Sequence, residues 1–219
     1  MTATLVDPAV TREKFQREYA LWDAYPHRAE RGWVLLAYEP AQLAIEIAFM
    51  GQLTLSVGSS PLPIVACAIR LTYENYDLWA PSLTFIDPFT RRPVKPHLAA
   101  VMLTPGGLRN VLIDAHPTTR LPFLCLPGIR EYHSHPQHTG DDWLLHRAMS
   151  EGSLSNICER IWRLMVTNIV GLTVAVQALP TWPLQAQLEI QIAQSGPMGI
   201  AGSGNIGVDK NVHPLPSHA

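Results

Sequence analysis

Apolar residues recur at every second position between residues 43 and 73, and this alternation limits the choice of fold more than any other pattern in the chain. The three runs are Leu43, Ile45, Ile47 and Phe49, then Leu53, Leu55 and Val57, and then Val65, Cys67, Ile69, Leu71 and Tyr73. Because side chains of a strand alternate between its two faces, the pattern predicts antiparallel strands with one face on a core. We expect a hairpin turn at Gly51, between the first two runs, and a core position for Cys67.

Two helices are expected on either side of this region. Asp7 before Pro8 is typical of an N-cap followed by proline at the first helical position, and the helix should span about residues 8–24. Its apolar stripe consists of Phe15, Tyr19 and Trp22. Ser153 can cap a second helix, whose apolar stripe consists of Leu154, Ile157, Cys158, Ile161, Leu164 and Met165. The order of helix, strands, irregular proline-rich segment and helix indicates an α+β fold.

The chain has 219 residues, enough for one domain with a sizeable core. We expect that domain to cover residues 1–193 and a flexible tail rich in glycine and proline to cover residues 194–219. A net charge of −2 offers no basic surplus for nucleic acid or an anionic membrane surface. The chain has only three cysteines, and no apolar run approaches the roughly 20 residues of a membrane span. It also lacks a signal-peptide pattern, so we expect a cytoplasmic protein.

Residues 116–146 concentrate the reactive side chains, with five of the nine histidines and one of the three cysteines, Cys125. Glu131, His133 and His135 follow at intervals of two, so in an extended strand they would project from one face. One carboxylate and two imidazoles can ligate Zn²⁺ or Fe²⁺, and Cys125 would complete a tetrahedral site. A free Cys125 would instead be a thiol beside two imidazoles, which could lower its pKa and activate it as a nucleophile.

The spacing Cys-x5-Glu-x-His-x-His, formed by Cys125, Glu131, His133 and His135, resembles a predicted metal-binding family named for these residue types. That family is found in prokaryotic operons that also encode ubiquitin-like proteins, E1-like enzymes and JAB-type peptidases. The resemblance implies a bound metal such as zinc. It also implies a ubiquitin-like pathway, with an E1-like enzyme, a modifier and a JAB-type peptidase as partners.

The order of elements also resembles the ubiquitin-conjugating (E2) fold, an antiparallel meander with an N-terminal helix and a helix after the cysteine loop. Residues 69–87, IRLTYENYDLWAPSLTFID, are similar to the aromatic and proline-bearing stretch that precedes an E2 strand. His116-Pro117 followed by Cys125-Leu126 is similar to the E2 arrangement His-Pro-Asn…Cys-Leu. The resemblance implies that Cys125 carries a ubiquitin-like modifier as a thioester, with His116 beside it.

The chain departs from the E2 pattern at Thr118, which stands where that family has the asparagine that supports the oxyanion. His133, His135 or a bound metal would then have to stabilise the developing charge. We expect a histidine of the pair His133 and His135 to polarise or deprotonate the attacking amine. His138 and His146 are open to two interpretations, as partners of the site or as surface residues.

His133-Ser134-His135-Pro136 is also similar to the His-x-His-Pro core of JAMM metalloproteases, which cleave ubiquitin-like isopeptide bonds. Asp141 and Asp142 follow too soon for the zinc-binding aspartate of that family, and His146 stands where it would be expected. Three hypotheses result. The preferred one is an E2-like transferase with Cys125 as nucleophile. The second is a non-catalytic, zinc-stabilised adaptor with the Cys-Glu-His-His set as ligands, and the third is a JAMM-like metallopeptidase.

Overall fold

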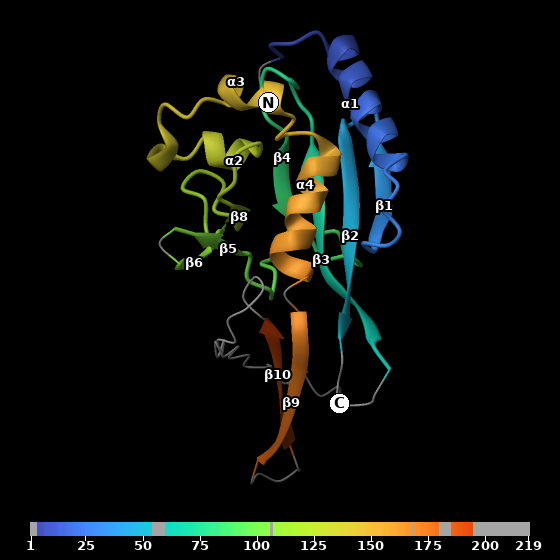
Figure 1. Cartoon of the computed structure of the whole chain (residues 1–219), viewed down its shortest axis with the longest axis vertical. Coiled ribbons are helices and arrows are strands. Elements are labelled where there is room, and N and C mark those ends of the chain that lie inside the picture. Colours follow the sequence, from blue (N-terminus) through green and yellow to red (C-terminus); the bar gives the residue numbers. More distant parts are fainter. Residues whose placement is uncertain (1–3, 54–59, 106, 168, 180–184, 195–219) are drawn as a thin grey trace, which may run out of the picture.

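The computed structural model describes residues 4–53, 60–105, 107–167, 169–179 and 185–194. Helix α1 (Pro8–Asp23) precedes an antiparallel four-stranded sheet of order β1-β2-β3-β4. Its strands are β1 (Trp33–Glu39), β2 (Ala44–Leu53), β3 (Leu62–Thr72) and β4 (Ser82–Phe85). The helix predicted after Ser153 is α4 (Leu154–Ile161), which continues into a π-helical turn, η3 (Trp162–Val166). The predicted α+β fold is therefore confirmed, in the order expected of an E2-like domain (Figure 1).

Short elements fill the segment between the sheet and α4. They are β5 (Val101–Thr104), β6 (Gly107–Asn110), β7 (Leu112–Ile113), β8 (Phe123–Leu124), α2 (Arg130–His133), the 3₁₀ turn η1 (Pro136–His138), α3 (Trp143–His146) and the 3₁₀ turn η2 (Arg147–Met149). β5 pairs with β6, and β7 pairs with β8. Figure 1 shows this group on the β4 side of the sheet, with α1 on the β1 side.

The core lies between the sheet and the two long helices. Ile45, Ile47 and Phe49 of β2 and Cys67, Ile69 and Leu71 of β3 are buried in this core, together with Phe15 and Trp22 of α1 and the apolar stripe of α4. The core position predicted for Val65 is wrong, because Val65 is 38% exposed and the strand register shifts between its partner Met50 and Phe49. Cys67 and Cys158 belong to this core, as expected, and burial raises the pKa of the Cys67 thiol to about 12. The periodicity of the sequence thus identified the buried face of each main element.

The turn predicted at Gly51 is wrong, because β2 continues through this residue to Leu53, and Gly51 pairs with Ile64 of β3. An added Cβ at Gly51 would lie 3.0 Å from Cδ1 of Ile169. Glycine here permits the close approach of the following ribbon and does not mark a turn. Leu55 and Val57 of the same predicted run lie outside the described residues.

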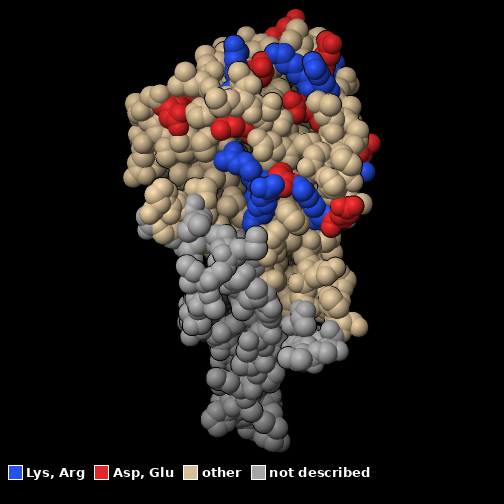
Figure 2. Space-filling view, in the orientation of Figure 1, with Lys and Arg blue, Asp and Glu red and all other residues tan. Residues whose placement is uncertain are grey.

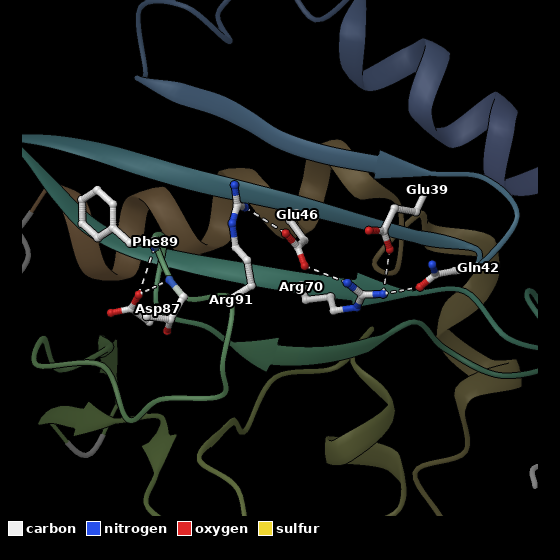
Figure 3. A network of polar contacts seen from close by, with 8 residues as sticks. Glu39, Gln42, Glu46, Arg70, Asp87, Phe89 and Arg91 are labelled. Atoms are coloured by element: carbon white, nitrogen blue, oxygen red, sulfur yellow. Dashed lines mark hydrogen bonds and ion pairs between the residues drawn. The ribbon is translucent and has the colours of Figure 1, made fainter.

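The opposite face of the sheet carries a buried charge network (Figure 3). Glu46 of β2 is only 4% exposed and forms ion pairs with Arg70 at 2.7 Å and Arg91 at 2.8 Å. Asp87 accepts hydrogen bonds from the backbone N–H groups of Phe89 and Thr90, which shapes the loop that carries Arg91. Two guanidinium groups therefore compensate the buried carboxylate and hold this loop against the sheet.

Strands β9 (Ile169–Leu179) and β10 (Gln185–Gln194) form a separate antiparallel ribbon that projects from the end of η3 (Figure 1). Residues 195–219, which include nearly all of the predicted tail, lie outside the described part of the chain. Within that part, no helix combines the length and apolar character that crossing a membrane requires. On the face drawn in Figure 2, acidic and basic side chains adjoin one another. Arg163 of η3 and Glu159 of α4 form an ion pair at 2.7 Å.

Candidate active site

Cys125 directly follows β8, on the side of the molecule that carries the short elements. Its backbone N–H donates to Val111 O at 2.7 Å, and its Sγ lies 3.1 Å from Nε2 of His138. Cys125 is partly exposed, whereas Cys67 and Cys158 are buried. It is therefore the one thiol of the three cysteines that a reagent or a partner protein can approach.

Partial burial raises the pKa of the Cys125 thiol, and the nearby charge of Arg109 on β6 opposes this effect. Burial and the neighbouring His135 lower the pKa of His138. Both shifts favour a neutral pair at neutral pH, in which the thiol donates its hydrogen to the imidazole. A neutral imidazole in this position can take the proton when the sulfur attacks an electrophile.

Three contacts fix the position of His138 in the 3₁₀ turn η1. Its backbone N–H donates to His135 O at 2.9 Å, and its carbonyl accepts from the N–H of Asp141 at 3.0 Å. Its ring stacks on Tyr132, with centroids 3.9 Å apart. The sequence left the role of His138 open, and the fold brings it to the cysteine across 13 residues.

The strand predicted for Glu131 to His135 is wrong, because Arg130–His133 form the short helix α2 and only a turn follows. Residues two apart on a helix point roughly 200° away from each other, so the expected common face does not exist. Glu131 is buried and accepts hydrogen bonds from Ser82 Oγ at 2.5 Å and from the N–H of Leu83 at 3.0 Å. Its carboxylate anchors α2 to β4.

His133 is held by both ring nitrogens. Nε2 accepts the N–H of Gly128 at 3.1 Å, and Nδ1 donates to the carbonyl of Asp141 at 2.8 Å. A neutral imidazole with this pattern has no lone pair left for a metal or for a proton. In this structure His138, and not His133, is the imidazole in contact with the thiol of Cys125.

His135 and His116 pack against the same ring. Their ring centroids lie 5.6 Å apart, and each lies near Phe123, at 5.5 Å and 5.1 Å respectively. His135 Nδ1 accepts the N–H of Gln137 at 3.2 Å. His116 is 1% exposed, and its Nδ1 accepts the N–H of Thr118 at 3.2 Å. His116 thus organises the turn that leads to β8.

The residues expected to bind zinc are not gathered into one group in this structure. The carboxylate of Glu131 and both nitrogens of His133 make hydrogen bonds within the protein. Over the described ranges, no group of three or more His, Cys, Asp or Glu side chains is arranged to hold a metal ion. The arrangement therefore gives no support to the four-ligand zinc adaptor or to the JAMM-like centre, and both stay hypotheses.

A series of polar contacts begins at Tyr132, whose ring stacks on His138. Tyr132 donates its hydroxyl hydrogen to Asp141 Oδ2 at 2.5 Å, and Asp141 Oδ1 lies 2.5 Å from Nε2 of His146. Nδ1 of His146 lies 2.8 Å from a carboxylate oxygen of Glu151. The Tyr132 hydroxyl, followed by His146, lowers the pKa of Asp141, and Asp141 in turn raises the pKa of His146. Tyr132 and Glu151 carried no signal in the sequence, because their roles depend on neighbours that only the fold supplies.

Comparison with known proteins places these residues in a family. The model of the Y4jH-like family, described as the Y4jH family, matches residues 6–119 and 106–169. A protein of Sinorhizobium fredii (strain NBRC 101917 / NGR234), named uncharacterized protein y4jH, is 35% identical over 176 residues. That match covers 71% of this chain and 82% of the relative.

Proposed function

This chain belongs to the Y4jH-like family, and we propose that it is an E2-like transferase that carries a ubiquitin-like modifier as a thioester on Cys125. The observation that carries the proposal is the 3.1 Å contact between the Sγ of Cys125 and Nε2 of His138. The contact lies in the loop between the meander and the last helix, where the E2-like order of elements implies the nucleophile. The proposed partners are an E1-like enzyme and the modifier that it activates.

In the charging step, the sulfur of Cys125 attacks the carbonyl carbon of the thioester on the E1-like enzyme. His138 accepts the thiol proton as the new C–S bond forms. When the bond to the E1 sulfur breaks, His138 returns the proton to the departing thiolate. The modifier is then bound to Cys125, and all protons are accounted for.

In the transfer step, an acceptor amine attacks the same carbonyl carbon. The C–N bond forms, His138 accepts a proton from the amine, and the bond to Cys125 breaks. The proton then passes to the sulfur, which regenerates the thiol. Arg109 brings positive charge close enough to affect the pKa of Cys125, and it can stabilise the oxyanion in place of the asparagine that Thr118 replaces.

The pKa of Cys125 is raised by partial burial and is not lowered as expected from two neighbouring imidazoles, so the proposal depends on His138 as the acceptor of the thiol proton. The buried cysteines cannot share this role. Burial raises the pKa of Cys67 to about 12 and also raises the pKa of Cys158, and both side chains lie in the core.

The test is to incubate the protein with an E1-like enzyme of the same pathway, ATP and the modifier, and to run the products with and without reductant. The wild type should form an adduct that reductant removes. Cys125→Ala should form none, His138→Ala should form it at least about tenfold more slowly, and the buried-site control Cys67→Ala should behave as wild type. If the E1-like enzyme charges itself normally and the wild type forms no adduct, the thioester function is wrong.

A further inference from the structure

Asp141 contacts several residues around the Cys125–His138 pair through both its backbone and its carboxylate. Its backbone N–H donates to the carbonyl of His138 at 3.0 Å, and its own carbonyl accepts from Nδ1 of His133 at 2.8 Å. Its two carboxylate oxygens meet the Tyr132 hydroxyl and Nε2 of His146, each at 2.5 Å. We propose that Asp141 is the positioning residue that holds His138 against Cys125.

The first path from Asp141 to His138 runs through Tyr132. The Tyr132 ring covers the His138 imidazole, with centroids 3.9 Å apart and an interplanar angle of 27°. The hydrogen bond from the tyrosine hydroxyl to Asp141 keeps that ring in place. Without it, Tyr132 could rotate away, and His138 would lose the surface that defines its orientation.

The second path runs through the backbone. His138 and Asp141 close a turn in which Gly140 has a left-handed φ of +93°. The N–H of Asp141 bonds the carbonyl of His138, so a displacement of Asp141 moves the residue that carries the imidazole. Both paths lead to the same consequence, a longer distance between Nε2 of His138 and the thiol.

The carboxylate of Asp141 is itself held by His146. Nε2 of His146 lies 2.5 Å from Oδ1 of Asp141, and its Nδ1 lies 2.8 Å from a carboxylate oxygen of Glu151. The hydrogen bond to Asp141, with the charges of Asp141 and Glu151, raises the pKa of His146 and favours its charged form. His133 packs beside this ring, with ring centroids 5.2 Å apart. His146 thus ties the Asp141 turn to the segment that leads into α4.

The inference concerns the same Cys125–His138 pair as the proposed function, but it can be tested without any partner protein. The measurement is the rate at which iodoacetamide alkylates Cys125 in the native full-length chain at neutral pH. His138→Ala should slow the reaction about tenfold or more, because the thiol loses its proton acceptor. Asp141→Asn should slow it by a similar factor, because an NH2 donor then replaces one of the two carboxylate oxygens that face Tyr132 and His146.

The decisive variant combines the two substitutions. If Asp141 acts through His138, the double variant should react no more slowly than His138→Ala alone, whereas independent effects would multiply. Asp142→Asn is the matched control. It removes the same charge one residue away and keeps the N-cap of α3, which Asp142 forms by accepting from the N–H of Leu144 at 2.8 Å. Its rate should equal that of the wild type.

Tyr132→Phe provides a second variant that removes only one hydroxyl group and should slow alkylation about threefold. Circular dichroism of each variant confirms that it is folded at the assay temperature. Wild-type alkylation of Asp141→Asn, or a double variant whose slowing is the product of the two single effects, would overturn the inference. Failure of E1-dependent adduct formation would remove the proposed function and leave this result standing, so the two can be told apart.

Discussion

Substitution of Gly128 by alanine tests how the loop after Cys125 is held in place. Gly128 has a φ of +89°, and its N–H donates to Nε2 of His133 at 3.1 Å. An added Cβ would overlap the backbone carbonyl group of Glu151 and lie 3.0 Å from the nitrogen of Gly152. These are backbone atoms, so no side-chain rotation can make room for the methyl group.

Two effects contribute to the expected loss of stability. A left-handed φ costs an L-residue with a side chain roughly 1–2 kcal/mol. Overpacking against backbone costs roughly 1–3 kcal/mol more. The sum is about 3 kcal/mol, and at about 2–4 °C for each kcal/mol in a chain of this size, the Tm should fall by about 6–12 °C.

Gly140→Ala is the matched control. Gly140 has nearly the same conformation, with φ of +93°, but a Cβ added at this position would meet nothing within 4 Å. Only the conformational cost applies, about 1–2 kcal/mol, and the Tm should fall by about 2–8 °C. Thermal unfolding followed by circular dichroism measures both. An equal loss of Tm in the two variants would refute the argument that Gly128 packs against the Glu151 carbonyl.

Three further results are expected. Replacement of Glu131 by leucine leaves the buried N–H of Leu83 unpaired, so the free energy of unfolding in urea should fall by about 1–3 kcal/mol. Dialysis of the wild type against a chelator should leave the free energy of unfolding unchanged. Asp141 is the main cause of the raised pKa of His146. The ion pairs of His146 therefore stabilise the fold fully below the ordinary histidine pKa of about 6.5. Their contribution is lost as the pH rises through the higher pKa of the folded state. Urea midpoints from about pH 6 to pH 9 should therefore decline more in the wild type than in His146→Gln, and parallel curves would contradict this assignment. Alkylation of the native protein followed by mass spectrometry should modify Cys125 alone, and the unfolded chain should take up label at all three of its cysteines.

The main elements could be predicted from the sequence because their burial repeats with the period of the backbone. The alternation from Ile45 to Leu71 identified the sheet and its core face, and the helical stripes identified α1 and α4. The same patterns assigned Cys67 and Cys158 to the core. The position of Gly51 was misread because a glycine between two apolar runs has the same appearance at a turn and at a close contact within a strand.

The candidate site was predicted only in part. The sequence singled out Cys125 and the histidines around it, but a spacing of two over the few residues from Glu131 to His135 is too short to distinguish a strand from a helical turn. Tertiary contacts decided the outcome, because β4 binds the carboxylate of Glu131 and thereby fixes the direction of α2.

The residue types of the Cys125 region are therefore a property of the sequence by itself, and their pairing is a property of the fold. Burial of apolar residues follows a local period, and each strand or helix shows it without reference to the others. Cys125 and His138 are 13 residues apart in the chain, and the geometry of their contact depends on the path of the segment between them. The path is set by the packing of Gly128 on Glu151 and by the bonds of Asp141, neither of which has a local pattern.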